Sequence, residues 1–211
     1  MKKIKLLVLG LVLITSYNCK EAKKETKKAS EETEQVEMYS IVEDSTAISF
    51  IAYKTSEKKP VGGKFTKVNL KNSNSASSSI DALNGLEFSI PVSSLFTNDA
   101  TGTRDPKILE FFFGVMDNTE LISGTFAFDE NKKCTVDLKL NGVSASLPLD
   151  YEVVDNNHIT FKGTLNLENW NALDALVSLN KACGILHTGG DGVSKTWNDV
   201  AIEASVYLEK K

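Results

Sequence analysis

Apolar and polar residues alternate along most of the chain after about residue 39, and this period of two is typical of strands that bury one face. Seven segments show the alternation clearly: residues 48–52, 86–92, 122–128, 134–140, 143–153, 159–167 and 200–208. An eighth segment, residues 64–70, shows it more weakly. The pattern therefore predicts eight strands.

One turn signal fixes the pairing of two of these strands. Asn141 and Gly142 separate residues 134–140 from residues 143–153. An Asn-Gly pair between two alternating runs is the strongest short-range hairpin signal. We therefore expect these two segments to pair as a hairpin.

Two short stretches break the alternation and predict helices. Asp105 followed by Pro106 indicates a helix start, with the aspartate as N-cap and the proline at the first helical position. Trp170, Leu173 and Leu176 have helical spacing. Because helices do not alternate with the strands, an antiparallel order is favoured over a parallel one. The prediction is an all-β fold, an eight-stranded antiparallel barrel with one or two short helices.

The N-terminal segment has the pattern of an export signal. Lysines at positions 2, 3 and 5 precede an apolar run over residues 6–14. This run is shorter than the about 20 apolar residues that cross a bilayer as a helix. It ends close to Cys19, where the chain resembles bacterial lipoprotein precursors. That resemblance implies removal of residues 1–18 and acylation of Cys19, for example with palmitate; a plain secretory signal that contains a cysteine is the alternative.

The segment after Cys19 is rich in Lys, Glu, Ala, Ser and Thr and has almost nothing to bury, which predicts a solvated, disordered linker. A short helix is the alternative, because Glu–Lys pairs at helical spacing each contribute about 0.2–0.5 kcal/mol. The expected organisation is a signal peptide over residues 1–18, the lipidated Cys19 with its linker over residues 19–38, and one domain over residues 39–211. We expect a membrane-anchored protein of the cell envelope, on the periplasmic face or the outer surface.

Composition and charge exclude some classes of function. The chain has 211 residues, of which 41% are hydrophobic and 25% charged, as in an ordinary globular protein of one domain. Its net charge of −4 offers none of the basic surface that nucleic acids require. Arg104 is the only arginine, which indicates a position that needs the planar guanidinium. It is a candidate for binding an anionic head group, an ion pair with an aspartate, or a cap over backbone carbonyls.

Cysteine and histidine residues give little evidence for a metal site or for catalysis. Cys134 and Cys183 remain after Cys19 is used, and they form either one disulfide or two separate thiols. Cys183, His187 and Asp191 are spaced by four, but two glycines break any helix that would carry them, and a structural zinc site takes four protein ligands. We expect no metal, no cofactor and no enzymatic activity, because no nucleophile has a recognisable base.

Three motifs together resemble the YceI-like family over roughly residues 40–211. They are residues 101–105 followed by the aromatic run 111–114, the Asn-Gly-Val hairpin at 141–143, and residues 192–197 before the last strand. The resemblance implies a lipocalin-like, eight-stranded barrel with an elongated apolar tunnel that binds a polyisoprenoid-type lipid. It also implies the absence of catalysis. The expected partner is an isoprenoid or other long-chain lipid, which the protein carries, stores or senses; the oligomeric state stays open.

Aromatic side chains are the candidates for contact with such a lipid, and Arg104 is the candidate for its head group. Inward aromatic residues can equally form an ordinary filled core, in which case the domain is a non-catalytic structural or protein-interaction module. At least one ring of the run 111–113 should face the tunnel mouth or a loop, because one helix face cannot bury all three. The lipid-binding candidates are Phe50, Phe88, Phe111, Phe112, Phe126, Phe128, Phe161, Trp170 and Trp197.

Overall fold

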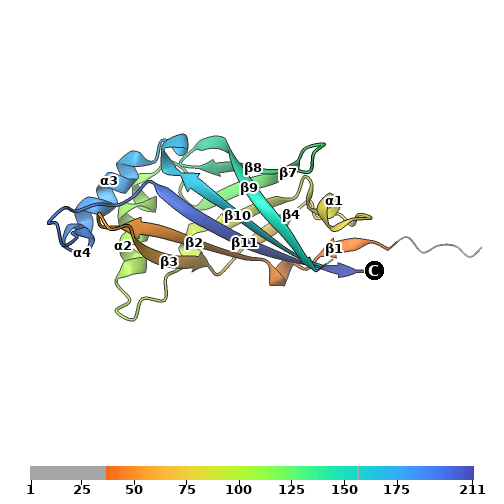
Figure 1. Ribbon diagram of the computed structural model, residues 1–211, viewed down its shortest axis with the longest axis horizontal. Helices are drawn as coiled ribbons and strands as arrows, with labels where there is room; N and C mark the ends of the chain where they lie inside the picture. Colours follow the sequence, from red (N-terminus) through yellow and green to blue (C-terminus); the bar gives the residue numbers. More distant parts are fainter. Residues whose placement is uncertain (1–36, 156) are drawn as a thin grey trace, which may run out of the picture. The chain divides into compact units, whose positions relative to one another are not determined.

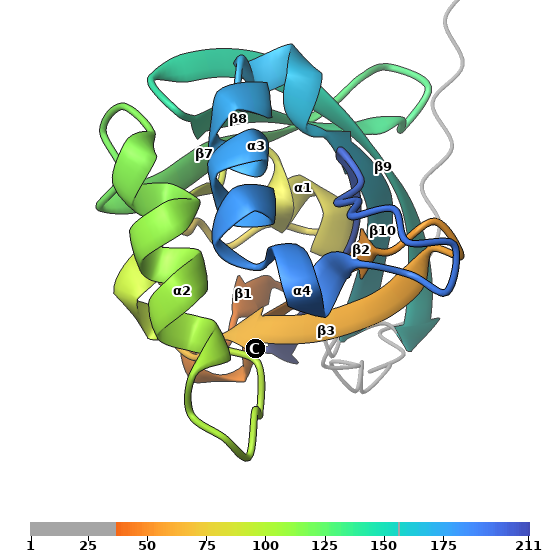
Figure 2. The same ribbon diagram turned by 90° about the vertical axis from the view of Figure 1, so that its left-hand side faces the viewer.

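The computed structural model describes residues 37–155 and 157–211. The predicted signal peptide, Cys19 and most of the predicted linker lie outside the described residues. The described part is a curled antiparallel sheet, with three helices gathered at one end and a short helix at the other (Figures 1 and 2). None of the helices in this part of the chain is long and apolar enough to cross a membrane.

Strands are the most abundant regular structure among the described residues. The strands are β1 (Tyr39–Ile41), β2 (Ala47–Lys54), β3 (Lys59–Phe65), β4 (Asn69–Lys71), β5 (Glu87–Pro91), β6 (Leu95–Phe96), β7 (Leu121–Phe128), β8 (Cys134–Leu140), β9 (Val143–Asp155), β10 (His158–Asn166) and β11 (Asp199–Lys210). The α-helices are α1 (Ser79–Leu83), α2 (Arg104–Phe111), α3 (Leu173–Ala182) and α4 (Gly184–His187). Short 3-10 turns are η1 (Glu43–Ser45), η2 (Val92–Ser94), η3 (Phe113–Val115) and η4 (Leu167–Trp170).

The sheet has more strands than the eight expected, and the difference has a simple cause. The order is β4-β5-β7-β8-β9-β10-β11-β2-β3-β6, with β1 paired to β11. The strand expected at residues 64–70 is interrupted between β3 and β4, and the turn η2 separates β5 from β6. Because β4 pairs with β5 and β3 pairs with β6, these two interrupted lengths of chain lie side by side. If β3 and β4 are counted as one strand, β5 and β6 as another, and β1 is left out, the sheet has the eight antiparallel strands that were predicted.

The Asn-Gly hairpin forms as predicted. Leu140 pairs with Val143, so Asn141 and Gly142 form a two-residue turn with φ angles of 52° and 70°. Both angles are positive, which asparagine and glycine tolerate better than other residues. The turn sets the register between β8 and β9.

Helix α2 begins differently from the prediction. The helix begins at Arg104 with Thr103 at the N-cap, and Asp105 is its second residue. The Asp105 carboxylate accepts hydrogen bonds from the backbone N–H and the hydroxyl of Thr97. The N–H groups of Thr103 and Arg104 donate instead to Asp99. The prediction of Asp105 as N-cap is therefore wrong, because an upstream carboxylate reaches the helix end.

Trp170 was predicted to share a helix with Leu173, and this is also wrong. Trp170 ends the 3-10 turn η4, and α3 begins only at Leu173. Asn171 between them has φ 52°, which ends the turn. The Trp170 side chain is fully buried, and its Nε1–H donates to the carbonyl oxygen of Leu138 at 2.8 Å. Satisfying the indole N–H in this way removes the cost of burying an unpaired donor.

Candidate functional site

The interior of the curled sheet holds an apolar cavity of about 140 Å³, which we call the inner cavity. Strand alternation and register explain its walls: Phe50 of β2 pairs with Ile202 of β11, and both side chains line the space. Helices α2 and α3 close it with Ile108 and Leu176. Its aromatic lining residues are Phe50, Phe65, Phe112, Phe113 and Trp197. Such a cavity stays dry and accommodates apolar groups, because water would find few partners there.

A second recess of about 500 Å³ adjoins the inner cavity, and we call it the mouth. The two spaces share Ala52, Ile108, Leu179 and Thr196 in their walls. The mouth lies among β2, β3, the start of α2, the end of α3, and α4, which gather at the helical end of the barrel (Figure 2). The walls of the mouth are largely apolar but include several polar and charged side chains, so an amphipathic molecule could extend from the mouth into the apolar interior.

Positive charge predominates in the mouth. Its wall contains the cationic side chains of Lys54, Arg104 and Lys107, against one carboxylate, that of Asp99. Hydrogen bonds from the Thr101 hydroxyl and from backbone N–H groups lower the pKa of Asp99 to about 2, so this carboxylate is ionised at neutral pH. The remaining excess of cations favours an anionic ligand group.

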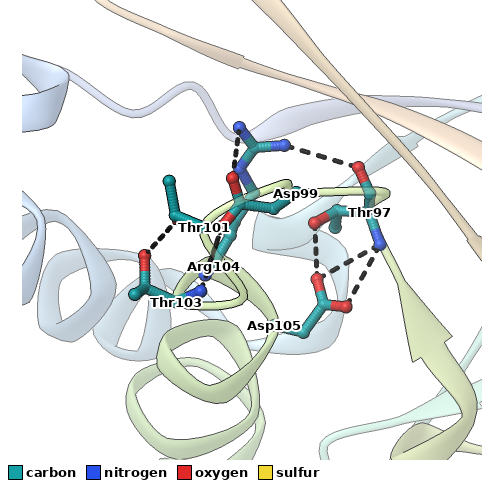
Figure 3. Close-up of polar contacts among 6 residues, drawn as sticks. All are labelled: Thr97, Asp99, Thr101, Thr103, Arg104 and Asp105. Carbon is teal, nitrogen blue, oxygen red and sulfur yellow. Dashed lines mark hydrogen bonds and ion pairs between the residues drawn. The ribbon is translucent and has the colours of Figure 1, made fainter.

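Arg104 is held at the edge of the mouth by weak contacts (Figure 3). Its Nη2 lies 3.8 Å from Oδ1 of Asp99, and its Nη1 donates to the carbonyl oxygen of Thr97 at 3.5 Å. The side chain is 41% exposed. Both structural roles considered from sequence, the ion pair with an aspartate and the contact with a carbonyl, are present. The contacts are long, so they orient the guanidinium while leaving donors for an incoming anion.

His187 belongs to a polar network between the two spaces. Its Nδ1 lies 2.7 Å from the Thr196 hydroxyl oxygen, and that hydroxyl donates to Oδ1 of Asn180 at 2.7 Å. Because the hydroxyl proton is directed to Asn180, the imidazole Nδ1–H donates to Thr196. Burial, with a further contribution from the charge of Lys54, lowers the pKa of His187 to about 4. The imidazole is therefore neutral at pH 7, and its Nδ1 carries the proton that is donated to Thr196.

The two cysteines of the domain are separate, buried thiols rather than a disulfide. Burial raises the pKa of the Cys134 thiol to about 12, which suppresses the reactive thiolate. Cys183 lies in the wall of the mouth. Among the described residues, no three His, Cys, Asp or Glu side chains are grouped so that they could hold a metal ion.

The predicted lipid-contact residues fall into two groups in the structure. Phe50, Phe112 and Trp197 line the inner cavity, and Arg104 lines the mouth. The others line neither space: Phe88, Phe126, Phe161 and Trp170 are buried, and Phe111 and Phe128 are partly buried. Contact between lipid and any of these residues stays a prediction.

Sequence reasoning missed several residues of the two spaces. Phe65 follows the inward alternation of β3 and could have been found from it. Lys54, Lys107 and His187 carry no such signal, since only the packing of helices over the barrel end brings them to one recess.

Comparison with known proteins identifies the fold family. The family model of the YceI-like domain matches residues 39–208. The chain belongs to the YceI-like family. No curated protein matches this YceI-like chain.

Two solved structures share the architecture of this YceI-like domain at low sequence identity. A polyisoprenoid binding domain from Saccharophagus degradans, implicated in plant cell wall breakdown, has a TM-score of 0.58 at 12% identity and covers 82% of this chain and 98% of its own. BcnA of Burkholderia cenocepacia has a TM-score of 0.50 at 12% identity and covers 80% of this chain and 99% of its own. At such identities the similarity establishes the fold alone.

Proposed function

We propose that this YceI-like domain binds a lipid whose isoprenoid-like chain enters the inner cavity and whose anionic head stays in the mouth. The single observation that carries the proposal is the direct connection of an apolar cavity to a recess with three cationic side chains. Ligand sites typically combine an apolar wall with a few polar groups that fix orientation. The similar domain from Saccharophagus degradans, described as polyisoprenoid-binding, supports the isoprenoid type of chain.

Binding without catalysis is part of this proposal. The one hydroxyl–imidazole pair in the mouth, Thr196 and His187, has the proton arrangement of a structural hydrogen bond. A base whose pKa is about 4 is also poorly matched to proton abstraction at neutral pH. The site therefore offers positioning and charge, but no activated nucleophile.

Lipid acylation of Cys19 is the second part of the proposal, because it would hold the domain beside a membrane. The apolar run before Cys19 and the charged linker after it support this tether. Leu186 of α4 lines the mouth and is 55% exposed, and its neighbour Ile185 is 93% exposed, which suits a site that receives apolar chains.

The binding proposal is tested with a prenyl monophosphate and the matching prenol. Trp197 lines the inner cavity, so its fluorescence should change on binding, while the fully buried Trp170 should give a constant background. The Trp197→Phe variant should lose the fluorescence change, which assigns the signal to Trp197, and native mass spectrometry follows binding of both compounds independently of fluorescence. A protein that binds neither compound would contradict the proposal and favour the alternative, a filled barrel that interacts with proteins.

The role of Arg104 is tested with the same two ligands. Arg104→Lys keeps the charge but loses the fork geometry, so we expect affinity for the prenyl phosphate to fall about fivefold to tenfold and prenol affinity to stay within about twofold. Lys139→Arg, on the exposed face of β8, exchanges the same two cationic side chains at a position that lines neither space and is the control. Equal losses for both ligands would remove Arg104 from the head-group site.

A further inference from the structure

The part of the barrel interior beyond the inner cavity is filled by aromatic side chains. Phe126 contacts Phe88 and Phe161 at ring-centroid distances of 5.8 and 5.2 Å, and Tyr151 contacts Phe161 and Phe128 at 6.0 and 5.6 Å. We call these five residues the aromatic floor. Phe161 is 1% exposed and Phe126 is 7% exposed, so little space remains around them.

Strand register places the aromatic floor below the inner cavity. Ile202 of β11 lines the cavity and pairs with Gly163 of β10. Ala204, two residues further along β11, pairs with Phe161. At about 3.3 Å per strand residue, the floor begins roughly 7 Å deeper than the level of Ile202.

Gly124 of β7 allows the floor to pack tightly. A Cβ atom at this position would lie 2.8 Å from Cζ of Phe88 and 3.0 Å from the carbonyl oxygen of Asp137. The Phe88 ring therefore occupies the space that a side chain at position 124 would need. A ligand chain cannot pass this level unless the packed rings move.

The size of the inner cavity limits how much of a chain it can take. Its volume is about 140 Å³, and an apolar cavity of about 150 Å³ binds one benzene molecule. One terminal isoprene unit is of this size. The mouth, at about 500 Å³, has the size of a site for a small ligand and has room for the next units and the head.

We propose that the aromatic floor is a length stop, so that the domain holds only about two to three isoprene units of an anionic lipid, whatever the full length of the chain. This inference rests on the proposed function and specifies how much of the ligand chain the domain holds. A polyprenyl chain several times longer gains nothing further, because its additional units find no apolar wall.

Four prenyl monophosphates with one head group test the length stop: geranyl, farnesyl, geranylgeranyl and undecaprenyl phosphate, each titrated into the purified full chain. We expect affinity to rise about tenfold from geranyl to farnesyl phosphate, and to change by less than about threefold for the two longer compounds. A further tenfold gain with either longer chain would overturn the length stop while supporting the lipid-binding function. Binding of none of the four would overturn both.

Two variants test which residues set the limit. Phe126→Leu lowers the floor and should raise affinity for geranylgeranyl phosphate at least threefold relative to farnesyl phosphate. Phe96→Leu, at a 42% exposed position that lines neither space, is the matched control and should change neither affinity.

Val200→Phe fills the inner cavity without removing any floor residue. It should lower the affinity for farnesyl phosphate about tenfold in a protein whose circular dichroism matches that of the parent. Unchanged affinity of a folded Val200→Phe protein would overturn the assignment of the inner cavity as the chain site.

Discussion

At the scale of single residues, burial lowers the pKa of His187 and keeps its imidazole neutral at pH 7. Sequence alone presents it as one of two histidines, spaced by four from a cysteine and an aspartate. In the structure its ring contacts Thr196, nine residues further along the chain, and lies near Lys54 at the end of the distant strand β2. The neutral form is favoured because the charged form would lose hydration and meet another positive charge.

This environment predicts a pH dependence of stability. The unfolded chain protonates His187 near pH 6.5, whereas the folded protein protonates it only near about pH 4. Between these values the unfolded chain binds more protons, so the free energy of unfolding should decrease as pH falls from about 6.5 to about 4. Urea unfolding at several pH values measures the slope.

His187→Asn retains a side-chain N–H for Thr196 but cannot titrate, so it should flatten this part of the pH profile. His158→Asn, which changes the other histidine of the chain, is the control for replacing an imidazole by an amide. A His187→Asn protein with the parent's pH profile would exclude His187 as the cause.

At the scale of elements, the turn between β8 and β9 shows why some local structure follows directly from sequence. Asn141 and Gly142 both adopt positive φ angles, and the flanking strands alternate as expected. The start of α2 did not follow in this way. Asp105 has the features of an N-cap, but its carboxylate accepts a hydrogen bond from the Thr97 N–H instead. The Asp99 carboxylate accepts the hydrogen bonds from the first N–H groups of the helix. Local signals fail where a neighbouring loop offers a better partner.

The Asn141 side chain ties this hairpin to η4, which predicts an effect larger than that of a turn residue alone. Its Oδ1 accepts from the Asp117 N–H at 2.8 Å, and its Nδ2 donates to the carbonyl oxygens of Trp170 and Asn171, each at 3.0 Å. Asn141→Ala loses these bonds and places a Cβ-bearing residue without a polar side chain at positive φ. We expect it to lower the free energy of unfolding by about 2–3 kcal/mol, measured by urea denaturation.

Asn141→Gly separates the two causes, because it relieves the backbone cost while still losing the hydrogen bonds. It should fall between Asn141→Ala and the parent. If Asn141→Ala unfolds within about 0.5 kcal/mol of the parent, the side-chain bonds contribute little.

At the scale of the whole molecule, the proposed arrangement is a lipid-binding barrel joined by a charged linker to an acylated cysteine. Two or more acyl chains anchor a protein stably, since one chain alone gives only marginal binding at about 0.8 kcal/mol per buried methylene. A tether also raises the effective concentration of the mouth near a membrane that supplies lipid.

Replacement of the acylated residue tests this arrangement. The Cys19→Ser protein should move from the membrane fraction to the soluble fraction, while the purified protein keeps its affinity for prenyl phosphates. Cys134→Ser, at a buried position in β8, is the matched control for loss of a thiol and should stay in the membrane fraction. A Cys19→Ser protein that still fractionates with membranes would contradict the tether.

The sequence by itself determined the strands, the Asn-Gly hairpin and the antiparallel class, because alternation and turn chemistry act between near neighbours. It also singled out Arg104, the only arginine, as a position that needs the planar guanidinium, with an anionic head group, an ion pair and a carbonyl cap as alternative partners. Only the tertiary structure decided which inward aromatic residues line empty space, such as Phe50, and which fill the floor, such as Phe161. The physical reason is that alternation states which face is buried, whereas empty volume depends on how side chains from many strands pack at the same depth.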